Sequence, residues 1–267
     1  MSRLDDKRGV GSWVGLLLMV FVISACANRP VETDARAGMD RTSPVRAAEI
    51  NTQLGIGYME RGQRQLALEK LEQAVGQDPE HVPAHLALAH LYGQLGDEGR
   101  AGRHFRRAAQ LAPNDGATLN SYAVYLCRRG DFRRAEQKFL RAADDPFYQT
   151  PEVALTNAGA CARRAGSIED AEQFLRRAIR IDPEFPDALL HLAHISYQQG
   201  DAFRARAFLQ RFEAAAMPEP GALLLGYRIE SNMNNPDEAR RYVMELERVF
   251  PDSSEARELR QSMSQHD

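Results

Sequence analysis

The sequence predicts an all-α fold built from helical hairpins that repeat along the chain. Small and apolar residues recur with a period of 34, a Gly or Asn stands five residues before each set, and Pro follows most sets. The composition agrees with helices, because the 267 residues are 43% hydrophobic, 27% charged and only 7% aromatic. A formal net charge of -3 gives no long-range attraction for nucleic acid, so we expect no nucleic-acid partner.

The first 25 residues read as a lipoprotein signal peptide. A polar, basic start precedes an apolar run over 13–23, which is too short for a comfortable membrane span. The run leads into Ile23-Ser24-Ala25-Cys26, which resembles the bacterial lipobox. This resemblance implies cleavage before Cys26, acylation of Cys26 and, because Ala27 instead of Asp follows, anchoring to the periplasmic face of the outer membrane. The alternatives are an ordinary signal peptide that contains a Cys, or an uncleaved anchor.

Residues 26–47 are expected to form a lipidated flexible tether. They are polar, contain Pro30 and Pro44, and show neither helical nor strand periodicity. About 20 residues extend over at most roughly 60–70 Å. Such a tether would let the folded part face a partner in the periplasm without a fixed orientation to the membrane.

The repeat occupies residues 48–253. Its recurring positions are Ala67, Leu71, Ala74 and Pro79; Ala101, Phe105, Ala108 and Pro113; Ala135, Phe139 and Ala142; Ala171, Leu175, Ala178 and Pro183; Ala205, Leu209 and Phe212; and Ala239, Val243, Leu246 and Pro251. The residues five places before the first Ala of each set are Gly62, Gly96, Gly130, Gly166, Gly200 and Asn234. Gly or Asn can adopt the left-handed conformation that ends a first helix, Ala lets the second helix approach closely, and Pro ends it.

This pattern resembles the tetratricopeptide repeat, whose first helix also matches Leu54, Gly55, Tyr58, Leu88, Ala89 and Tyr92. The resemblance implies a right-handed superhelical solenoid of six repeats, stabilised by the interfaces between neighbouring units. A helical bundle with accidental spacing is the alternative. Residues 254–267 follow as a capping helix or a frayed tail, and the two extra residues between repeats three and four fall in a loop over 144–151, expected to pack on the solenoid.

Cys127 and Cys161 lie in the first helices of repeats three and four. The inserted residues offset them by two repeat positions, and stacked helices about 8–10 Å apart can bring such side chains within bridging range. Secretion to an oxidising compartment favours a structural disulfide. Two small buried residues in a helix interface are the alternative, and without a C-x-x-C spacing a redox-active pair is disfavoured.

Signatures of catalysis and metal binding are missing from the sequence. We find no glycine-rich phosphate loop, no G-x-S-x-G and no H-E-x-x-H. Neither His191 with His194 nor His85 with His90 is completed by Cys, Asp or Glu into a recognisable zinc site. We therefore expect no enzyme activity, no cofactor and no small-molecule substrate.

The predicted functional surface is the groove lined by the first helices. Positions 5, 9 and 12 of each unit should face it, since spacings of four and three keep residues on one helix side. In the first two units the candidates for partner binding are Thr52, Ile56, Met59, Leu86 and His90. Exposed apolar grooves usually bind a peptide or a helix, unless the tether covers this one. Repeats three and four are more polar, with Asn120, Thr156, Arg163 and Arg164.

Residues 120–166 resemble a more specific family, the type IV pilus biogenesis lipoproteins called the PilF or PilW pilotins. The matching elements are Leu126-Cys127, Gly130, Pro146-Phe147-Tyr148 with Pro151, and Asn157-Ala158-Gly159 with Cys161. The resemblance extends over the lipobox, the tether and six repeats. It implies a lipoprotein that binds the type IV pilus secretin subunit and promotes its outer-membrane localisation and multimerisation. The alternative is a lipoprotein adaptor that recruits a periplasmic enzyme or outer-membrane assembly machinery.

Overall fold

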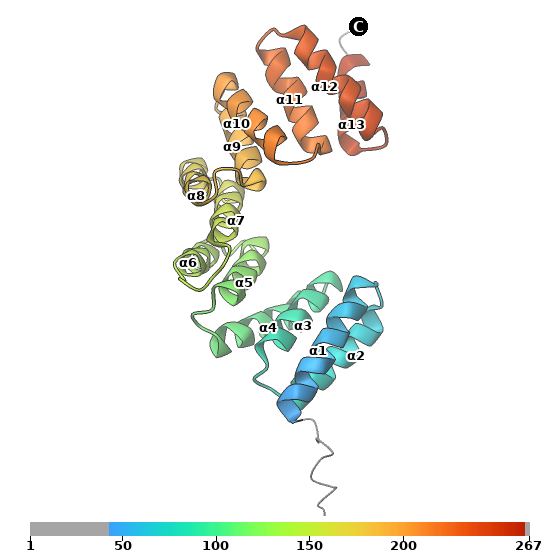
Figure 1. Cartoon of the computed structure of the whole chain (residues 1–267), viewed down its shortest axis with the longest axis vertical. Helices are drawn as coiled ribbons and strands as arrows, with labels where there is room; N and C mark the ends of the chain where they lie inside the picture. Colours follow the sequence, from blue (N-terminus) through green and yellow to red (C-terminus); the bar gives the residue numbers. More distant parts are fainter. Residues whose placement is uncertain (1–42, 265–267) are drawn as a thin grey trace, which may run out of the picture. The chain divides into compact units, whose positions relative to one another are not determined.

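The computed structural model describes residues 43–264, in which every regular element is an α-helix (Figure 1). The helices are α1 (Pro44–Glu60), α2 (Arg64–Gln77), α3 (Val82–Gln94), α4 (Glu98–Leu111), α5 (Gly116–Arg128), α6 (Phe132–Ala143), α7 (Pro151–Arg164), α8 (Ile168–Ile181), α9 (Pro186–Gln198), α10 (Ala202–Ala215), α11 (Pro220–Asn232), α12 (Pro236–Val249) and α13 (Ser254–Ser264). Consecutive helices pack as antiparallel pairs, and each pair packs on the next. The six-repeat solenoid predicted from the sequence is confirmed.

Each pair turns at the Gly or Asn that the sequence singled out. These residues have positive φ angles, from 55° at Asn234 to 86° at Gly166. In the first turn the backbone N–H of Gln63 donates to the carbonyl of Tyr58 at 2.9 Å, across Gly62, and the same bond recurs from Asp97 to Tyr92. This is the Schellman arrangement, which satisfies carbonyls at the helix end and needs a left-handed residue.

Close helix packing explains the recurring small residues. Ala67 and Leu71 of α2 are completely buried. Opposite them, a Cβ added to Gly55 of α1 would lie 2.5 Å from Cγ of Leu71. The two helices therefore approach to a distance that only Gly permits at that point.

The folded part begins earlier than predicted. Pro44 is the first residue of α1, and the Ser43 side chain accepts a 3.2 Å hydrogen bond from the N–H of Arg46. The boundary of the tether at residue 47 is therefore wrong, because Pro is well suited to the first turn of a helix, where its missing N–H costs nothing. The signal peptide (1–25), Cys26 and the remainder of the tether lie outside the described residues.

The end of the described chain is a helix, which was one of the two sequence alternatives. Ala256 and Leu259 of α13 are buried, and α13 packs against α11 and α12. In this position it covers the apolar side of the last repeat as a cap. Between residues 43 and 264, no helix is long and apolar enough to cross a membrane.

The inserted loop joins α6 to α7, as expected. Tyr148 packs beside the buried Leu119, Ala142 and Ala154, whereas the Phe147 side chain is 84% exposed. The expectation that this loop packs on the solenoid thus holds for Tyr148 and fails for Phe147.

Candidate functional site

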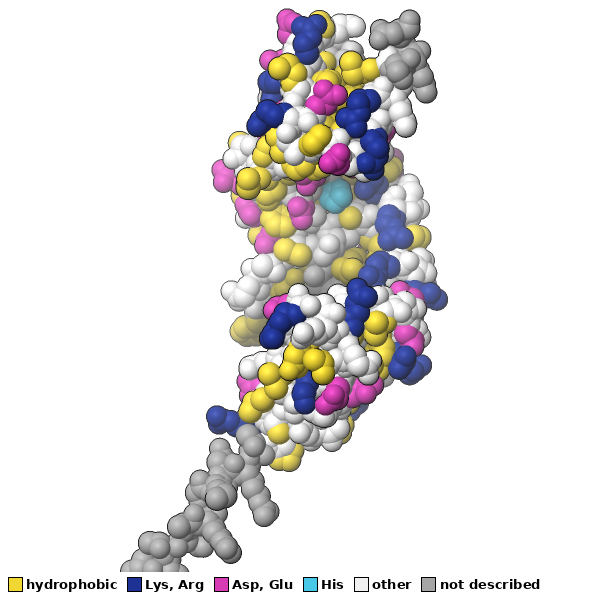
Figure 2. All heavy atoms as spheres, turned by 90° about the vertical axis from the view of Figure 1, so that its right-hand side faces the viewer, with side chains coloured by type: hydrophobic (Ala, Val, Ile, Leu, Met, Phe, Trp, Pro, Cys, Tyr) yellow, Lys and Arg dark blue, Asp and Glu magenta, His cyan; other side chains and the backbone are white. Residues whose placement is uncertain are grey.

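The first helices of most neighbouring repeats pack side by side along the inner face. Contacts join α1 to α3, α5 to α7, α7 to α9 and α9 to α11, and α5, α7 and α9 lie on the inner side of the curve (Figure 1). Figure 2 looks onto this face, which is hollowed between its two ends. A partner that lies along the hollow would contact several repeats.

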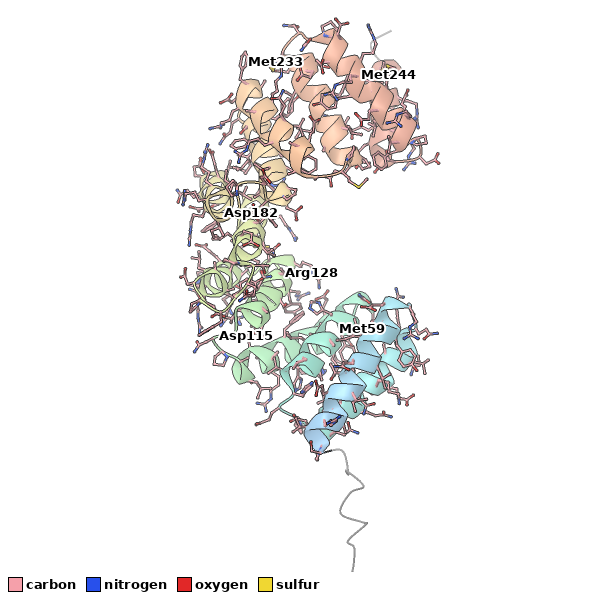
Figure 3. All side chains as sticks on the ribbon, viewed as in Figure 1. Met59, Asp115, Arg128, Asp182, Met233 and Met244 are labelled. Carbon is pink, nitrogen blue, oxygen red and sulfur yellow. A yellow bond between two sulfur atoms is a disulfide. The ribbon has the colours of Figure 1, made fainter. Side chains whose placement is uncertain are left out.

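A groove of about 540 Å³ opens on this face between α1 and α3. Its lining consists of Ile56, Met59, Glu60, Pro83, Leu86, Ala87, His90 and Gln94. Met59 lies where α1 runs beside α3 (Figure 3). Ile56 is 40% exposed, so the groove presents apolar surface to solvent.

Most of the predicted groove residues are brought together. Ile56, Met59, Leu86 and His90 line the groove. Thr52 does not, because its side chain is only 3% exposed and its hydroxyl donates to the carbonyl of Ala48 at 2.7 Å. The assignment of Thr52 to the groove is wrong: the first helix is rotated so that this position faces the core.

The sequence did not predict several other residues that line the groove. Pro83, Ala87 and Gln94 continue the stripe of Leu86 and His90 along α3. Their spacing of three, four and seven residues is the signal that identifies one side of a helix. Extending the pattern along α3 beyond positions 5, 9 and 12 of the repeat would have identified these three residues.

His90 forms the polar end of this groove. Its ring meets Phe105 edge-on at 5.1 Å. Partial burial lowers the pKa of His90, and the positive charge of Arg128 lowers it further. Arg128 reaches over α3, because a Cβ on Gly93 would lie 3.2 Å from its Nη2. The groove therefore offers apolar contacts with a neutral imidazole and a cation at one end.

The next repeats supply a polar section. Nδ2 of Asn157 donates to Oδ1 of Asn120 at 3.1 Å, which links α7 to α5 across the inner face. Thr156 is buried, while Arg163 is half-buried and Arg164 is exposed. Of the polar residues expected here, Thr156 is therefore part of the core.

The histidines that the structure describes are not arranged as a metal centre. His85 turns away from His90, and its Nδ1 lies 2.9 Å from Nδ1 of His104 while its Nε2 lies 3.0 Å from the carbonyl of Pro79. Across the part of the chain that the structure describes, no three His, Cys, Asp or Glu side chains are placed to hold a metal ion.

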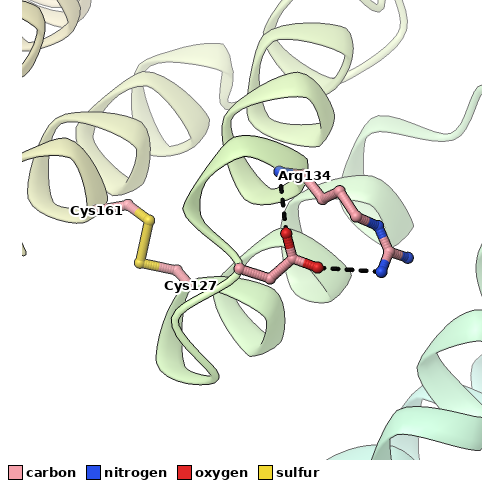
Figure 4. Close-up of a disulfide and its surroundings, with 4 residues drawn as sticks. Cys127, Arg134 and Cys161 are labelled. Carbon is pink, nitrogen blue, oxygen red and sulfur yellow. Dashed lines mark hydrogen bonds and ion pairs between the residues drawn. A yellow bond between two sulfur atoms is a disulfide. The ribbon is translucent and has the colours of Figure 1, made fainter. Parts of the chain in front are cut away.

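Cys127 and Cys161 form a disulfide between α5 and α7 (Figure 4). Their Cα atoms are 5.8 Å apart, a usual separation for the bond. Both residues are buried, and Asp131 caps α6 nearby through the N–H of Arg134. The disulfide fixes the first helices of repeats three and four to each other.

Comparison with known proteins agrees with this architecture. Tetratricopeptide repeat families match residues 52–116, 123–184 and 162–224. The type IV pilus assembly protein PilF of Pseudomonas aeruginosa is 26% identical over 230 residues, which cover 86% of this chain and 88% of PilF.

Solved structures give the same result. The crystal structure of PilW, described as a widely conserved type IV pilus biogenesis factor, superposes with a TM-score of 0.73 at 29% identity, over 79% of this chain and 97% of PilW. The structure of Pseudomonas aeruginosa PilF superposes with a TM-score of 0.71 at 26% identity, over 82% of this chain and 99% of PilF. The chain therefore belongs to the tetratricopeptide repeat family and is a homologue of the type IV pilus proteins PilF and PilW.

Proposed function

We propose that this type IV pilus biogenesis protein acts as a pilotin, which binds the secretin subunit and promotes its multimerisation in the outer membrane. The single observation that supports this most is the open apolar groove between α1 and α3, in a chain homologous to PilF and PilW over most of its length. A binding role also suits a solenoid fold whose repeats present side chains along one inner face.

The groove has the properties of a site for apolar side chains of a partner. Its volume of about 540 Å³ lies within the usual range of binding pockets, about 300–1,000 Å³. Ile56 and Leu86 line the groove from two different repeats. Burial of such surface contributes about 25 cal/mol per Å², so a few apolar side chains of a secretin segment would supply useful affinity.

The lipid anchor is the second part of the proposal. Acyl chains on Cys26 would hold the protein at the periplasmic face of the outer membrane, since two or more chains suffice for stable anchoring. The helical unit would then carry the bound secretin subunit to the membrane in which it assembles.

The experiment compares charges placed inside and outside the groove. Ile56→Asp together with Leu86→Asp should abolish capture of the purified secretin and remove its heat-resistant multimers from an unheated gel. Leu54→Asp is the matched control, because Leu54 lies on the same helix and is 45% exposed, against 40% for Ile56, but does not line the groove. Secretin capture that survives the groove variant, or is lost equally in the control, contradicts the groove assignment.

A deletion strain separates the pilotin from a general adaptor. Loss of twitching and of secretin multimers, with other outer-membrane proteins at normal levels, is the expected result. A broad defect of the outer membrane would instead favour an adaptor for general envelope machinery.

A further inference from the structure

The first helix exposes apolar side chains at positions that the next repeat buries. Ile50 and Leu54 of α1 are 43% and 45% exposed. The residues 34 places further on are Ala84, which is completely buried, and Leu88, which is 1% exposed. Ala84 packs with Ala74 of the preceding repeat. Ile50 and Leu54 therefore lie where a preceding repeat would pack, and within residues 43–264 no repeat precedes α1.

The two ends of the row of helices differ in chemistry. At the far end from α1, the last repeat is covered by α13, and Arg257, Glu258 and Arg260 of α13 are exposed (Figure 1). This charged end does not match the apolar side chains of α1. Stacking of one copy's α1 on another copy's α13 is therefore disfavoured, and like ends suit each other better.

Small and large apolar residues alternate in a regular stripe on the outer side of α1. Ala47, Ile50, Leu54 and Gly57 are separated by three, four and three residues, the spacing of a seam between two helices. The two large side chains occupy the middle of the stripe and the small residues its ends. In an antiparallel pair of α1 helices, Ile50 would pack beside Leu54 of the second copy, and Ala47 beside Gly57 of the second copy. The stripe is thus complementary to itself.

The charges at the ends of α1 favour the same arrangement. Arg46 is in the first turn and Glu60 is the last residue, an order opposite to the one that the helix dipole favours. Neither charge therefore stabilises α1 through its dipole. Arg46, Gln53 and Glu60 recur every seven residues, so they share one flank of the stripe. An antiparallel second copy would place Arg46 of each chain beside Glu60 of the other.

We propose that the outer side of α1 binds the same surface of a second copy of this chain and forms a two-fold symmetric dimer with antiparallel α1 helices. Such a contact closes on itself and adds no third copy. The 17 residues of α1 extend over about 25 Å, so the contact is smaller than the roughly 1,600 Å² of a typical stable complex, and the dimer is weak.

The dimer would leave the groove between α1 and α3 open. Ile56 lines that groove, and it is two residues, or about 200° around the helix, from Leu54. The inference therefore goes beyond the proposed function and does not depend on it.

Sedimentation equilibrium of residues 42–267, a unit with its own core, tests the dimer. The native unit should change from monomer to dimer between about 5 and 500 µM, a range suited to a small interface. Leu54→Asp should weaken dimerisation at least 10-fold, because the symmetry places the new charge in the interface twice. Ile56→Asp is the matched control, since Ile56 is on the same helix and 40% exposed, and it should change the dissociation constant less than 3-fold. A native unit that stays monomeric throughout, or equal weakening in both variants, would overturn the dimer.

A charge exchange tests the antiparallel arrangement and guards against misfolding. Arg46→Glu alone should weaken dimerisation, because it brings two carboxylates together at each end of the contact. The substitution agrees with the helix dipole, so the monomer should keep its native circular dichroism. The double variant Arg46→Glu with Glu60→Arg should recover the native dissociation constant within 3-fold. A double variant that dimerises no better than Arg46→Glu would contradict this arrangement.

Two other occupants of the outer side of α1 are distinguishable from a second copy. A unit of residues 27–267 that stays monomeric while 42–267 dimerises would show that the segment before α1 covers this surface. Binding of a monomeric 42–267 unit to vesicles of phosphatidylethanolamine and phosphatidylglycerol, lost in Leu54→Asp, would show a lipid surface. Either result overturns the dimer. We expect 27–267 to dimerise, no vesicle binding, and capture of secretin by the monomeric Leu54→Asp variant.

Discussion

The carboxylate of Asp145 accepts a 2.8 Å hydrogen bond from the backbone N–H of Gly116, 29 residues away in the chain. Gly116 begins α5, where a helix leaves its first N–H groups without partners. Tyr148 packs over the same point, because a Cβ on Gly116 would lie 2.6 Å from Cβ of Tyr148. The inserted loop after α6 therefore closes back onto the start of α5 and holds both helices of the third repeat.

Asp145→Ala should destabilise the protein by about 1 kcal/mol, the usual cost of losing a side-chain cap on a helix N-terminus. Urea unfolding of residues 42–267, followed by circular dichroism, measures the change. Asp144→Ala is the control, because the Asp144 side chain is 73% exposed and its ion pair with Arg177 is 3.8 Å long. We expect less than about 0.5 kcal/mol there. A loss as small in Asp145→Ala would show that the loop does not hold the helix.

A buried ion pair joins repeats five and six. The Glu230 side chain is 5% exposed, and its two oxygens accept hydrogen bonds from Nε of Arg206 at 2.7 Å and from Nδ2 of Asn235 at 3.0 Å. Arg206→Met should cost about 3–5 kcal/mol, because it leaves a buried carboxylate without its cation. The free energy of unfolding in urea measures this loss.

The control is an exposed ion pair on α12, in the last repeat. Arg240 and Asp237 are 70% and 91% exposed, so Arg240→Met should change the free energy of unfolding by less than about 1 kcal/mol. The double variant Arg206→Met with Glu230→Leu should recover most of the stability, since replacing both members of a buried pair by apolar residues is often neutral. A double variant as unstable as Arg206→Met alone would contradict this account.

The sequence predicts features that depend on neighbouring residues, and it misses features that depend on contacts between helices. The positive φ at Gly62 and Asn234 depends on a few neighbouring residues, so the 34-residue period predicts it. The side of α1 that faces the groove depends on how Gly55 of α1 packs against Leu71 of α2, and the family positions alone misplaced Thr52.

Pairs between different helices leave no local signal. Arg206 and Glu230 are 24 residues apart, and nothing in their spacing marks them as partners before the repeats are stacked. The effect of Arg163 on His191 and His194 is of the same kind. The two histidines are recognisable as neighbours on one helix, but the arginine whose charge lowers the pKa of both belongs to the preceding repeat.

The disulfide should contribute strongly to stability. Closing a loop across a sequence separation of 34 removes unfolded-state entropy worth about 3–4 kcal/mol at 25 °C. The fragment 42–267 lacks Cys26, so a shift in mobility between non-reducing and reducing gels reports this bond alone. Reductant should lower the Tm of the native fragment and leave that of the Cys127→Ser, Cys161→Ser double variant unchanged. Equal effects on both would show that the cysteines are not oxidised.

Acidification should destabilise the second repeat through His104. Burial and, to a smaller extent, the positive charge of the neighbouring His85 together lower the pKa of His104 from 6.5 to about 4. The two rings approach with Nδ1 atoms 2.9 Å apart, an arrangement that has room for one proton between them. Above pH 6.5 His104 is neutral in both the folded and the unfolded chain. As the pH falls from 6.5 towards 4, His104 binds a proton in the unfolded chain but stays neutral in the folded chain. The free energy of unfolding therefore decreases in that pH window.

The size of the effect follows from proton linkage. Each pH unit in the window costs at most about 1.4 kcal/mol per histidine, and partial exposure of the ring reduces this to about 1 kcal/mol between pH 6.5 and 5. His104→Gln should lose correspondingly less stability than the native chain when urea unfolding is repeated at pH 7.5 and pH 5. Measuring each variant against itself at the two pH values removes the cost of the substitution at neutral pH. If His104→Gln and the native chain lose the same free energy, the pair of rings does not carry the pH dependence, and His194, whose pKa is also lowered to about 4, becomes the group to substitute next.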